Sequence, residues 1–374
     1  MNRFVKNIEI GFRRSLIRLL RWFAGSRKPI ITVTDFAKCK FLFVRQDRIG
    51  DVLISTPLWW SLKDSYKSAA VDVLLSTNNQ FVLDNDPQIR KRWIYDKGIV
   101  STWKLIHGIR REHYDFVIDL MDNPSATSTL ICLFSGARWT VGLDKDNSYV
   151  YDVVVPLMSR RDSHIVDRIA RLLVPFGIDP SLGDLRIHYT VSEQARRFAR
   201  EKFVEQSLLP GKPIGINISA GHDVRFWGVE NFRTLILELN KKLRNASFVV
   251  LSKPSQSHFA EDIVRGFENA VSPPATRVFD EFAALIENVR LLVTPDTSAV
   301  HLAAAFGIPS VVMYVQSDKN LRIWEPYKTR SEVLVADVDD LRVIKPDQVV
   351  QATLRLLAER HHQRRYARRG AVRA

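Results

Sequence analysis

The sequence contains very little cysteine: only Cys39 and Cys132 among 374 residues. So small a number excludes a disulfide scaffold and a cysteine-based metal cluster, and it is typical of proteins from a reducing compartment. The patterns HExxH, CxxC, GxxxxGK[ST] and GxSxG are missing too. Zinc hydrolysis, P-loop phosphoryl transfer and α/β-hydrolase chemistry therefore find no support.

Long apolar runs are also absent. The longest candidate, 291–315, contains Asp296, His301 and two prolines, so we expect no transmembrane span. Hydrophobic residues make up 46% of the chain and charged residues 26%, which is the balance of a soluble globular protein. A length of 374 residues exceeds the usual size of a single core and predicts two domains.

Acidic residues are too few to balance the basic ones, and the net charge is +14. Most of the excess lies at the ends of the chain. Residues 1–28 carry +7 and residues 359–374 carry +5, which leaves +2 for the long middle. A domain that reads a nucleic-acid sequence more often carries its charge on the folded surface, so we expect no specific nucleic acid as a partner.

Residues 1–30 predict a basic amphipathic helix. Its apolar residues share one face of a helical wheel, opposite four arginines; the apolar residues are Val5, Ile8, Phe12, Leu16, Leu19, Leu20 and Phe23. Such a helix suits an anionic membrane surface, contacted through residues 1–28. A helix packed on the body through the same face is the alternative. Arg18 and Arg21 interrupt any signal-peptide core, so we expect a cytoplasmic protein, peripheral on the inner face of the cell membrane.

Apolar segments of strand length alternate with helical patterns along the remaining chain. In the first half, strands are expected at 41–44, 71–75, 92–95, 115–120, 138–143 and 150–155, with helices at 101–112, 126–134 and 163–176. In the second half, strands are expected at 213–218, 247–251, 290–294 and 310–314, with helices at 230–244, 256–267, 280–288, 299–306 and from 346. This alternation predicts an α/β fold with two Rossmann-like domains, 38–178 and 185–345, that face each other across a cleft. A C-terminal helix and arginine-rich tail, 346–374, complete the chain.

The stretch 41–62 joins an apolar run to a polar loop and a helical pattern. Phe41 to Val44 have the length of a buried parallel strand, and apolar residues recur at helical spacing from Asp51, with Pro57 as an interruption. Open α/β sheets bind ligands at the carboxyl ends of their strands, although this loop lacks the glycines of GxGxxG. Taken alone, the stretch is explained more simply as an ordinary β–α turn in which Asp51 caps the helix.

A loop in the second half has the composition of an anion site. Ser219, Ala220 and Gly221 follow a predicted strand and are small enough to let backbone N–H groups approach an anion. Arg225 adds positive charge and a bidentate fork. A loop with a solvated arginine explains this segment equally well.

Another loop resembles the start of a phosphate-binding helix. Asp296, Thr297 and Ser298 can cap a helix whose free N–H groups and dipole suit a phosphate. His301 follows within about one turn and can face the same anion. A capped helix with a packed histidine is the alternative. Three polar loops after strands of two Rossmann-like halves nevertheless favour an enzyme that binds its substrates in a cleft.

At these segments the chain resembles the lipopolysaccharide heptosyltransferase family, glycosyltransferase family 9, over roughly residues 40 to 345. VRQDRIGDVLISTP is similar to the opening motif of the family, and DFVIDLMDN to a later segment of its first domain. GINISAGHDVRFWGVENF resembles its anion-binding loop, and VTPDTSAVHLAAAFGIPSVVMY its Asp-Thr-Gly-x-x-His helix start. Arg225 stands where the family usually has lysine, Ser298 replaces a glycine, and Ile218-Ser-Ala-Gly221 replaces Pro-Gly-Ala.

The resemblance implies a GT-B fold and inverting sugar transfer without an essential metal or other cofactor. The first domain would hold the acceptor and the second a nucleotide-sugar donor, with ADP-heptose favoured. Asp51 matches the carboxylate proposed as general base. The implied donor-binding residues are Ser219, Ala220, Gly221, Arg225, Asp296, Thr297, Ser298 and His301. The expected acceptor-side residues are Arg45, Arg48, Gly50 and Asn123.

The leading hypothesis is therefore transfer of heptose or a related sugar to a lipopolysaccharide-type, lipid-linked glycan. A sugar-nucleotide 2-epimerase of the same fold is an alternative, and it would convert a nucleotide sugar with no acceptor present. A catalytically degenerate membrane-surface protein is a further alternative, because the departures from the family pattern gather around Arg225 and Ser298.

Overall fold

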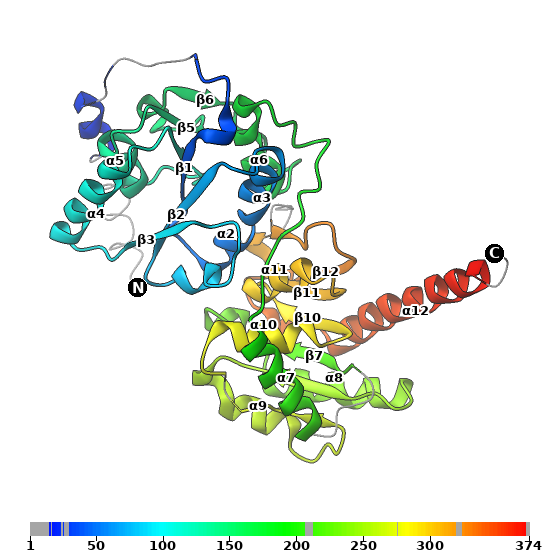
Figure 1. Ribbon diagram of the computed structural model, residues 1–374. Coiled ribbons are helices and arrows are strands. Elements are labelled where there is room, and N and C mark those ends of the chain that lie inside the picture. The colour runs from blue at the N-terminus through cyan, green and yellow to red at the C-terminus, as the bar shows by residue number, and fades with distance from the viewer. Residues whose placement is uncertain are drawn as a thin grey trace. The chain divides into compact units, whose positions relative to one another are not determined.

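The computed structural model of the protein describes residues 15, 17–23, 25, 30–205, 212–274, 276–318 and 324–371. The chain divides into two compact units, Met1–Leu185 (unit 1) and Arg186–Ala374 (unit 2). Each unit is built on a parallel sheet flanked by helices (Figure 1). The predicted α/β class is confirmed.

The sheet of unit 1 has the strand order β3-β2-β1-β4-β5-β6, with every neighbouring pair parallel. Its strands are β1 (Lys40–Val44), β2 (Ala70–Ser76), β3 (Lys91–Tyr95), β4 (Phe116–Asp119), β5 (Trp139–Leu143) and β6 (Val153–Val155). Its helices are α2 (Ile49–Leu53), α3 (Thr56–Ser65), α4 (Ile99–Glu112), α5 (Ala126–Phe134) and α6 (Ile165–Ala170). The direction of strand addition reverses between β1 and β4, which makes that point the topological switch of the sheet.

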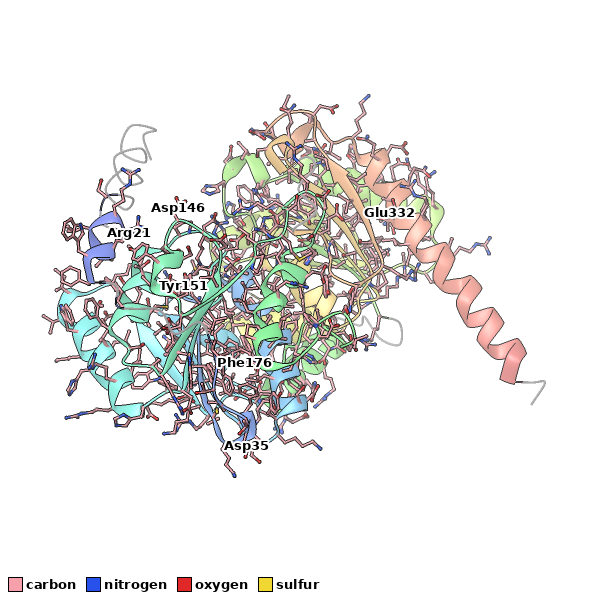
Figure 2. All side chains as sticks on the ribbon, turned by 90° about the horizontal axis from the view of Figure 1, so that it is seen from above. Arg21, Asp35, Asp146, Tyr151, Phe176 and Glu332 are labelled. Carbon is pink, nitrogen blue, oxygen red and sulfur yellow. The ribbon has the colours of Figure 1, made fainter. Side chains whose placement is uncertain are left out.

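The central strand β1 is buried on both faces, which accounts for its continuous apolar sequence. Leu42 and Val44 share a core cluster with side chains of α4 and α5. The other face is aromatic: Phe41 stacks on Phe116 at 5.1 Å between ring centroids, and Phe176 meets both rings edge-on. Figure 2 labels Phe176. The alternation of side chains along the strand therefore divides the core into two layers.

The helical pattern after Asp51 forms two helices instead of one. α2 ends at Leu53, and α3 begins at Thr56 with Pro57 in its first turn. A proline is tolerated there because the first N–H groups of a helix have no partner within the helix. Pro57 thus starts a helix where we expected it to interrupt one.

The sheet of unit 2 has the order β12-β11-β10-β7-β8-β9, again parallel throughout. Its strands are β7 (Ile214–Asn217), β8 (Phe248–Leu251), β9 (Ala270–Val271), β10 (Leu291–Pro295), β11 (Ser310–Tyr314) and β12 (Ser331–Val335). Its helices are α7 (Glu193–Glu205), α8 (Val229–Lys242), α9 (Ser257–Val264), α10 (Phe279–Glu287), α11 (Ser298–Ala305) and α12 (Pro346–Ala371). Here the switch point lies between β7 and β10.

Three elements of unit 2 were not anticipated from the sequence. α7 is strongly charged, β9 has two residues, and β12 is an edge strand that is only partly buried. The two strands are too short or too exposed to show an apolar period, and the buried face of α7 includes only small apolar residues, Ala195 and Ala199, before Phe203. The remaining elements lie close to their expected ranges.

The predicted N-terminal helix falls largely outside the described residues. Within the described part, 17–20 are helical and the 3-10 turn η1 spans Arg21–Phe23. Ile17 and Leu20 are buried, and Tyr149 of unit 1 donates its hydroxyl to the carbonyl of Ile17. This segment therefore packs on unit 1. Among the described residues, no helix combines the length and apolar character needed to span a bilayer.

Candidate active site

The β1–α2 loop of unit 1 is organised by the buried side chain of Arg45. Its Nε donates to the carbonyl of Asp51 at 3.0 Å, and its Nη2 donates to Asp51 Oδ1 at 3.2 Å. Its Nη1 donates to the carbonyl of Leu120, just beyond β4, at 2.7 Å. The guanidinium therefore ties the loops after β1 and β4 together at the switch point, and only 1% of Arg45 is exposed.

Asp51 lies inside the first turn of α2, with Arg48 at the N-cap and no side-chain cap bond. The interpretation of Asp51 as a helix cap is therefore wrong, because its carboxylate turns to Arg45 instead. Gly50 precedes Asp51 on the same short helix, and Arg48 is exposed beside it. Arg45 was expected on the acceptor side, but its burial points to positioning of Asp51.

A buried carboxylate at the end of β4 supports the neighbouring loop. Asp119 Oδ2 accepts from the hydroxyls of Tyr151 at 2.5 Å and Ser128 at 2.8 Å, and from Lys145 Nζ at 3.1 Å. Burial, reinforced by the Asp119 charge, raises the pKa of Tyr151 well above its usual value, so its hydroxyl remains a donor. A Cβ on Gly142 would lie 2.5 Å from the Tyr151 ring, so glycine is required for the ring to reach Asp119.

The predicted acceptor-side residue Asn123 stands on this β4 loop, among cations. Its Oδ1 accepts from Arg160 Nη2 at 2.6 Å, and Arg160 also donates to Asp122 at 3.2 Å. Arg168 of α6 forms an ion pair with Asp122 at 3.3 Å and is only 1% exposed. Its Nε and Nη1 make no hydrogen bond within the described residues, and burial lowers its pKa. Two arginines thus pair with Asp122, and one of them, Arg160, also contacts Asn123.

In unit 2 the two predicted donor loops meet, because β7 and β10 are adjacent strands. Asn217 joins them: its Nδ2 donates to Thr294 at 2.8 Å and to Thr297 at 3.2 Å, while its Oδ1 accepts from the Ser219 N–H at 3.1 Å. One buried amide therefore holds both loops at the switch point of the sheet.

Arg225 and Asp296, both predicted donor-site residues, pair with each other. Arg225 lies on the 3-10 turn η6 (Asp223–Arg225), and its Nη1 donates to the Asp296 carboxylate and, at 3.3 Å, to its carbonyl. Both side chains remain partly exposed. The arginine is thereby held over the start of α11, where an anion can compete with the carboxylate for it.

The small-residue loop after β7 is held by the segment that follows the neighbouring strand β8. The Ala220 N–H donates to Gln256 Oε1 at 3.2 Å, and Lys253 Nζ donates to the Ala220 carbonyl at 2.7 Å. Gly221 is exposed, and a Cβ there would meet nothing within 4 Å. Ala220 therefore shapes the loop through its backbone, and Lys253 brings a second cation to it.

Thr297 caps α11, as expected, and accepts from the Ala299 N–H at 3.4 Å. Ser298 is the first residue of this helix. His301 is buried, and its Nδ1 has no hydrogen-bond partner in the described part of the chain. Burial lowers the pKa of His301 to about 4, although the nearby Asp296 opposes this, so the ring is neutral at neutral pH. A neutral imidazole can donate or accept a hydrogen bond without adding charge.

Sequence reasoning missed several residues of these sites; they are Asp119, Lys145, Tyr151, Arg160, Arg168, Asn217 and Lys253. A polar residue at the end of an apolar strand, as at Asp119 and Asn217, is a usable signal for such support. The arginines and lysines carried no such signal, because exposed basic residues are common throughout the chain. Among the described residues, no group of three or more His, Cys, Asp or Glu side chains could hold a metal ion.

Two parallel α/β units, each with polar loops at its switch point, have the architecture of GT-B glycosyltransferases. The chain belongs to glycosyltransferase family 9 (heptosyltransferase), whose model matches residues 102–349. It is therefore a glycosyltransferase of the heptosyltransferase type, as the sequence motifs predicted.

Individual relatives agree with this assignment. The chain is 26% identical over 342 residues to lipopolysaccharide heptosyltransferase 3 of Escherichia coli (strain K12), covering 83% of this chain and 96% of that protein. The crystal structure of the glycosyl transferase family 9 from Veillonella parvula DSM 2008 has a TM-score of 0.76 at 20% identity, with 87% and 99% of the two chains covered. E. coli heptosyltransferase WaaC with ADP-2-deoxy-2-fluoro heptose has a TM-score of 0.68 at 17% identity, with 86% and 99% covered.

Proposed function

We propose that the protein is an inverting, metal-independent glycosyltransferase. It would move heptose or a related sugar from a nucleotide-sugar donor, ADP-heptose in preference, to a lipopolysaccharide-type, lipid-linked glycan. The observation that carries this proposal is that each unit has a suitable loop at its own switch point: unit 1 holds the ordered carboxylate of Asp51, and unit 2 holds a cationic, helix-capped loop pair. The relatives named as lipopolysaccharide heptosyltransferases support the choice of sugar and acceptor.

Unit 2 would bind the donor diphosphate. The N-terminus of α11 offers N–H groups and a favourable dipole, and Arg225 and Lys253 offer positive charge beside it. The leaving diphosphate gains negative charge as the glycosidic bond breaks, so stabilising it is the largest single task of the site. Cations and N–H groups can perform the task that a divalent ion performs elsewhere.

Unit 1 would bind the acceptor and activate its hydroxyl. Asp51 would take the hydroxyl proton as the oxygen attacks the anomeric carbon from the face opposite the diphosphate, which inverts the configuration. Arg48, Gly50 and Asn123 would line the acceptor side. Arg160, beside Asn123, suits acidic groups of a lipopolysaccharide-type glycan.

A donor comparison tests the function directly. Purified protein is given truncated lipopolysaccharide with ADP-, UDP-, GDP- or CMP-linked sugars, in the presence of EDTA, and nucleotide release is measured. We expect acceptor-dependent release from ADP-heptose at a rate at least about tenfold above the others, since a missing base contact typically costs more than 1 kcal/mol. Isomerised donor without acceptor would instead identify a 2-epimerase. Tight binding without turnover would identify a degenerate enzyme.

We also propose that the protein is peripheral on the inner membrane face and contacts it through residues 1–28 and α4. Trp22 is 89% exposed, Ile99 is 80% exposed and Trp103 is 55% exposed. The rings of Phe23 and Trp103 both pack on Phe134, so η1 and α4 form one apolar surface. Exposed basic residues accompany it, and Figure 2 shows Arg21 at the edge of unit 1; the others are Arg18, Lys97 and Lys104. Tryptophan beside basic residues suits an anionic lipid interface.

The membrane contact predicts the behaviour of a double variant. Trp22→Ser with Trp103→Ser should lower binding to vesicles rich in anionic lipid by about tenfold or more, because each buried indole contributes over 1 kcal/mol. Binding is measured by flotation at low and high salt, with neutral vesicles for comparison. Leu182→Ser removes an equally exposed apolar residue elsewhere in unit 1 and serves as the control. Unchanged flotation of the double variant would contradict the contact.

A further inference from the structure

The loop that carries Asp51 contains a second carboxylate, Asp47, held by the same guanidinium. Asp47 Oδ1 lies 3.4 Å from Arg45 Nε, and Asp51 Oδ1 lies 3.2 Å from Arg45 Nη2. The two carboxyl groups are also within hydrogen-bonding reach of each other. One cation therefore serves two carboxylates that stand four positions apart.

The two carboxylates are not equivalent. The Asp51 carboxylate accepts a hydrogen bond from Arg45 Nη2. Arg45 Nε, which lies near Asp47, donates its hydrogen bond to the backbone carbonyl of Asp51. Asp47 Oδ1 is consequently a buried oxygen without a hydrogen-bond partner among the described residues. The Asp47 side chain keeps 25% exposure and that of Asp51 only 10%, so Asp47 is the member of the pair with the better access to solvent.

Protonation of Asp47 would give the two carboxyl groups a hydrogen-bond donor and reduce their combined charge to one. A protonated Asp47 can donate to Asp51, and the remaining single negative charge is matched by Arg45. Burial, opposed by the Arg45 charge and assisted by the Asp51 charge, raises the pKa of Asp47 to about 7. The other carboxylates facing Arg45 are Asp119 and Asp122, and each has a cation of its own, Lys145 and Arg168.

We propose that Asp47 is a positioning residue that receives, through Asp51, the proton removed from the acceptor hydroxyl and returns it to solvent. This inference rests on the proposed function, in which Asp51 is the base. Asp47 touches no substrate in this scheme.

The proton balance of the step is simple. The acceptor O–H bond breaks and its proton goes to Asp51, while the oxygen forms a bond to the anomeric carbon and the bond from that carbon to the diphosphate oxygen breaks. Asp51 then passes the proton to ionised Asp47 and is ready for the next acceptor. Asp47 finally releases the proton to water, so the products are glycosylated acceptor, nucleoside diphosphate and one proton.

The test compares pH profiles of acceptor-dependent nucleotide release at saturating substrates. In the wild type, kcat should rise with pH as Asp47 loses its proton near pH 7. Asp47→Asn should lower kcat by about tenfold at pH 8 and remove this acid limb, because an amide cannot accept the proton. Asp47→Glu should restore the limb. Asp64→Asn, an exposed carboxylate on α3, serves as the control and should behave as the wild type.

Thermal stability gives a readout that does not depend on turnover. The folded-state pKa of Asp47 is raised, so its contribution to stability is fully present below about pH 4 and is lost as the pH rises through about 7. At each pH the melting temperature of the wild type is subtracted from that of Asp47→Asn. This difference should be about 5 °C larger at pH 8 than at pH 4.

The outcomes separate this role from the proposed function. Acceptor-dependent release with an unchanged acid limb in Asp47→Asn would overturn the role of Asp47 alone. A uniform loss of activity at every pH, not restored by glutamate, would also overturn it and mark Asp47 as merely structural. No acceptor-dependent release from the wild type, with Asp51→Asn indistinguishable from it, would overturn the proposed function and this role together.

Discussion

Asp51→Asn should lower kcat by about 100- to 10,000-fold, which is the usual contribution of a general base. The substitution keeps the shape of the side chain, and its amide oxygen can still accept from Arg45 Nη2. The loop should therefore stay in place while the proton acceptor is lost. Nucleotide release with saturating donor and acceptor measures the effect, and the melting temperature reports whether the loop is preserved.

We expect Asp51→Asn to impair turnover and leave donor binding intact. Asp51 belongs to unit 1, whereas the predicted donor residues belong to unit 2. ADP affinity, measured by calorimetry, should consequently remain within about twofold of the wild-type value, since no donor contact is removed. A kcat within about threefold of wild type would show that another group takes the proton. Asp64→Asn is again the matched carboxylate control.

Arg225→Ala should have the second large effect. Charge-assisted hydrogen bonds to a phosphate are worth about 1.5–3 kcal/mol, so ADP should bind about 10- to 100-fold more weakly. The loss also leaves the Asp296 carboxylate without Arg225 at the site where the diphosphate would sit. Repulsion then adds to the lost attraction, and kcat/KM should fall by about 1,000-fold.

Two further variants separate charge from geometry at this position. Arg225→Lys keeps the positive charge and carries the residue usual in the family, so its activity should stay within about tenfold of the wild type. Arg355 lies on α12 and forms an exposed ion pair with Glu332 of β12, so Arg355→Ala should leave ADP binding unchanged. ADP binding by Arg225→Ala that matches this control would show that the diphosphate does not reach Arg225.

Most elements could be predicted because their sequences carry a strong period. The strand β1 is buried on both faces, so its sequence is a continuous apolar run. The helix α8 repeats apolar residues on one face. The two-residue strand β9 and the edge strand β12 carry too few buried residues to show such a pattern. Pro57 was misjudged for another reason: its position relative to the helix start depends on where the preceding turn ends.

The candidate site was predictable where a polar loop follows an apolar strand. This pattern singled out the loops of Asp51, Arg225 and Asp296 as candidates, whereas Asn123 came from the family resemblance, and their roles stay predictions. Their partners were not found in this way, because Arg45 meets Leu120 across 75 positions of sequence and Asn217 meets Thr294 across 77. Such contacts depend on which strands become neighbours, and no local pattern encodes that choice.

The alternating α/β architecture, the family motifs and the candidate loops follow from the sequence alone, because hydrophobic period and motif spacing are local properties. The environment of each side chain depends instead on the tertiary fold. The fold buried Arg45 beneath the loop, placed Asp47 and Asp51 on one guanidinium, and paired Arg225 with Asp296. Burial and charge pairing arise from groups brought together by the order of the strands, and no local sequence pattern encodes them.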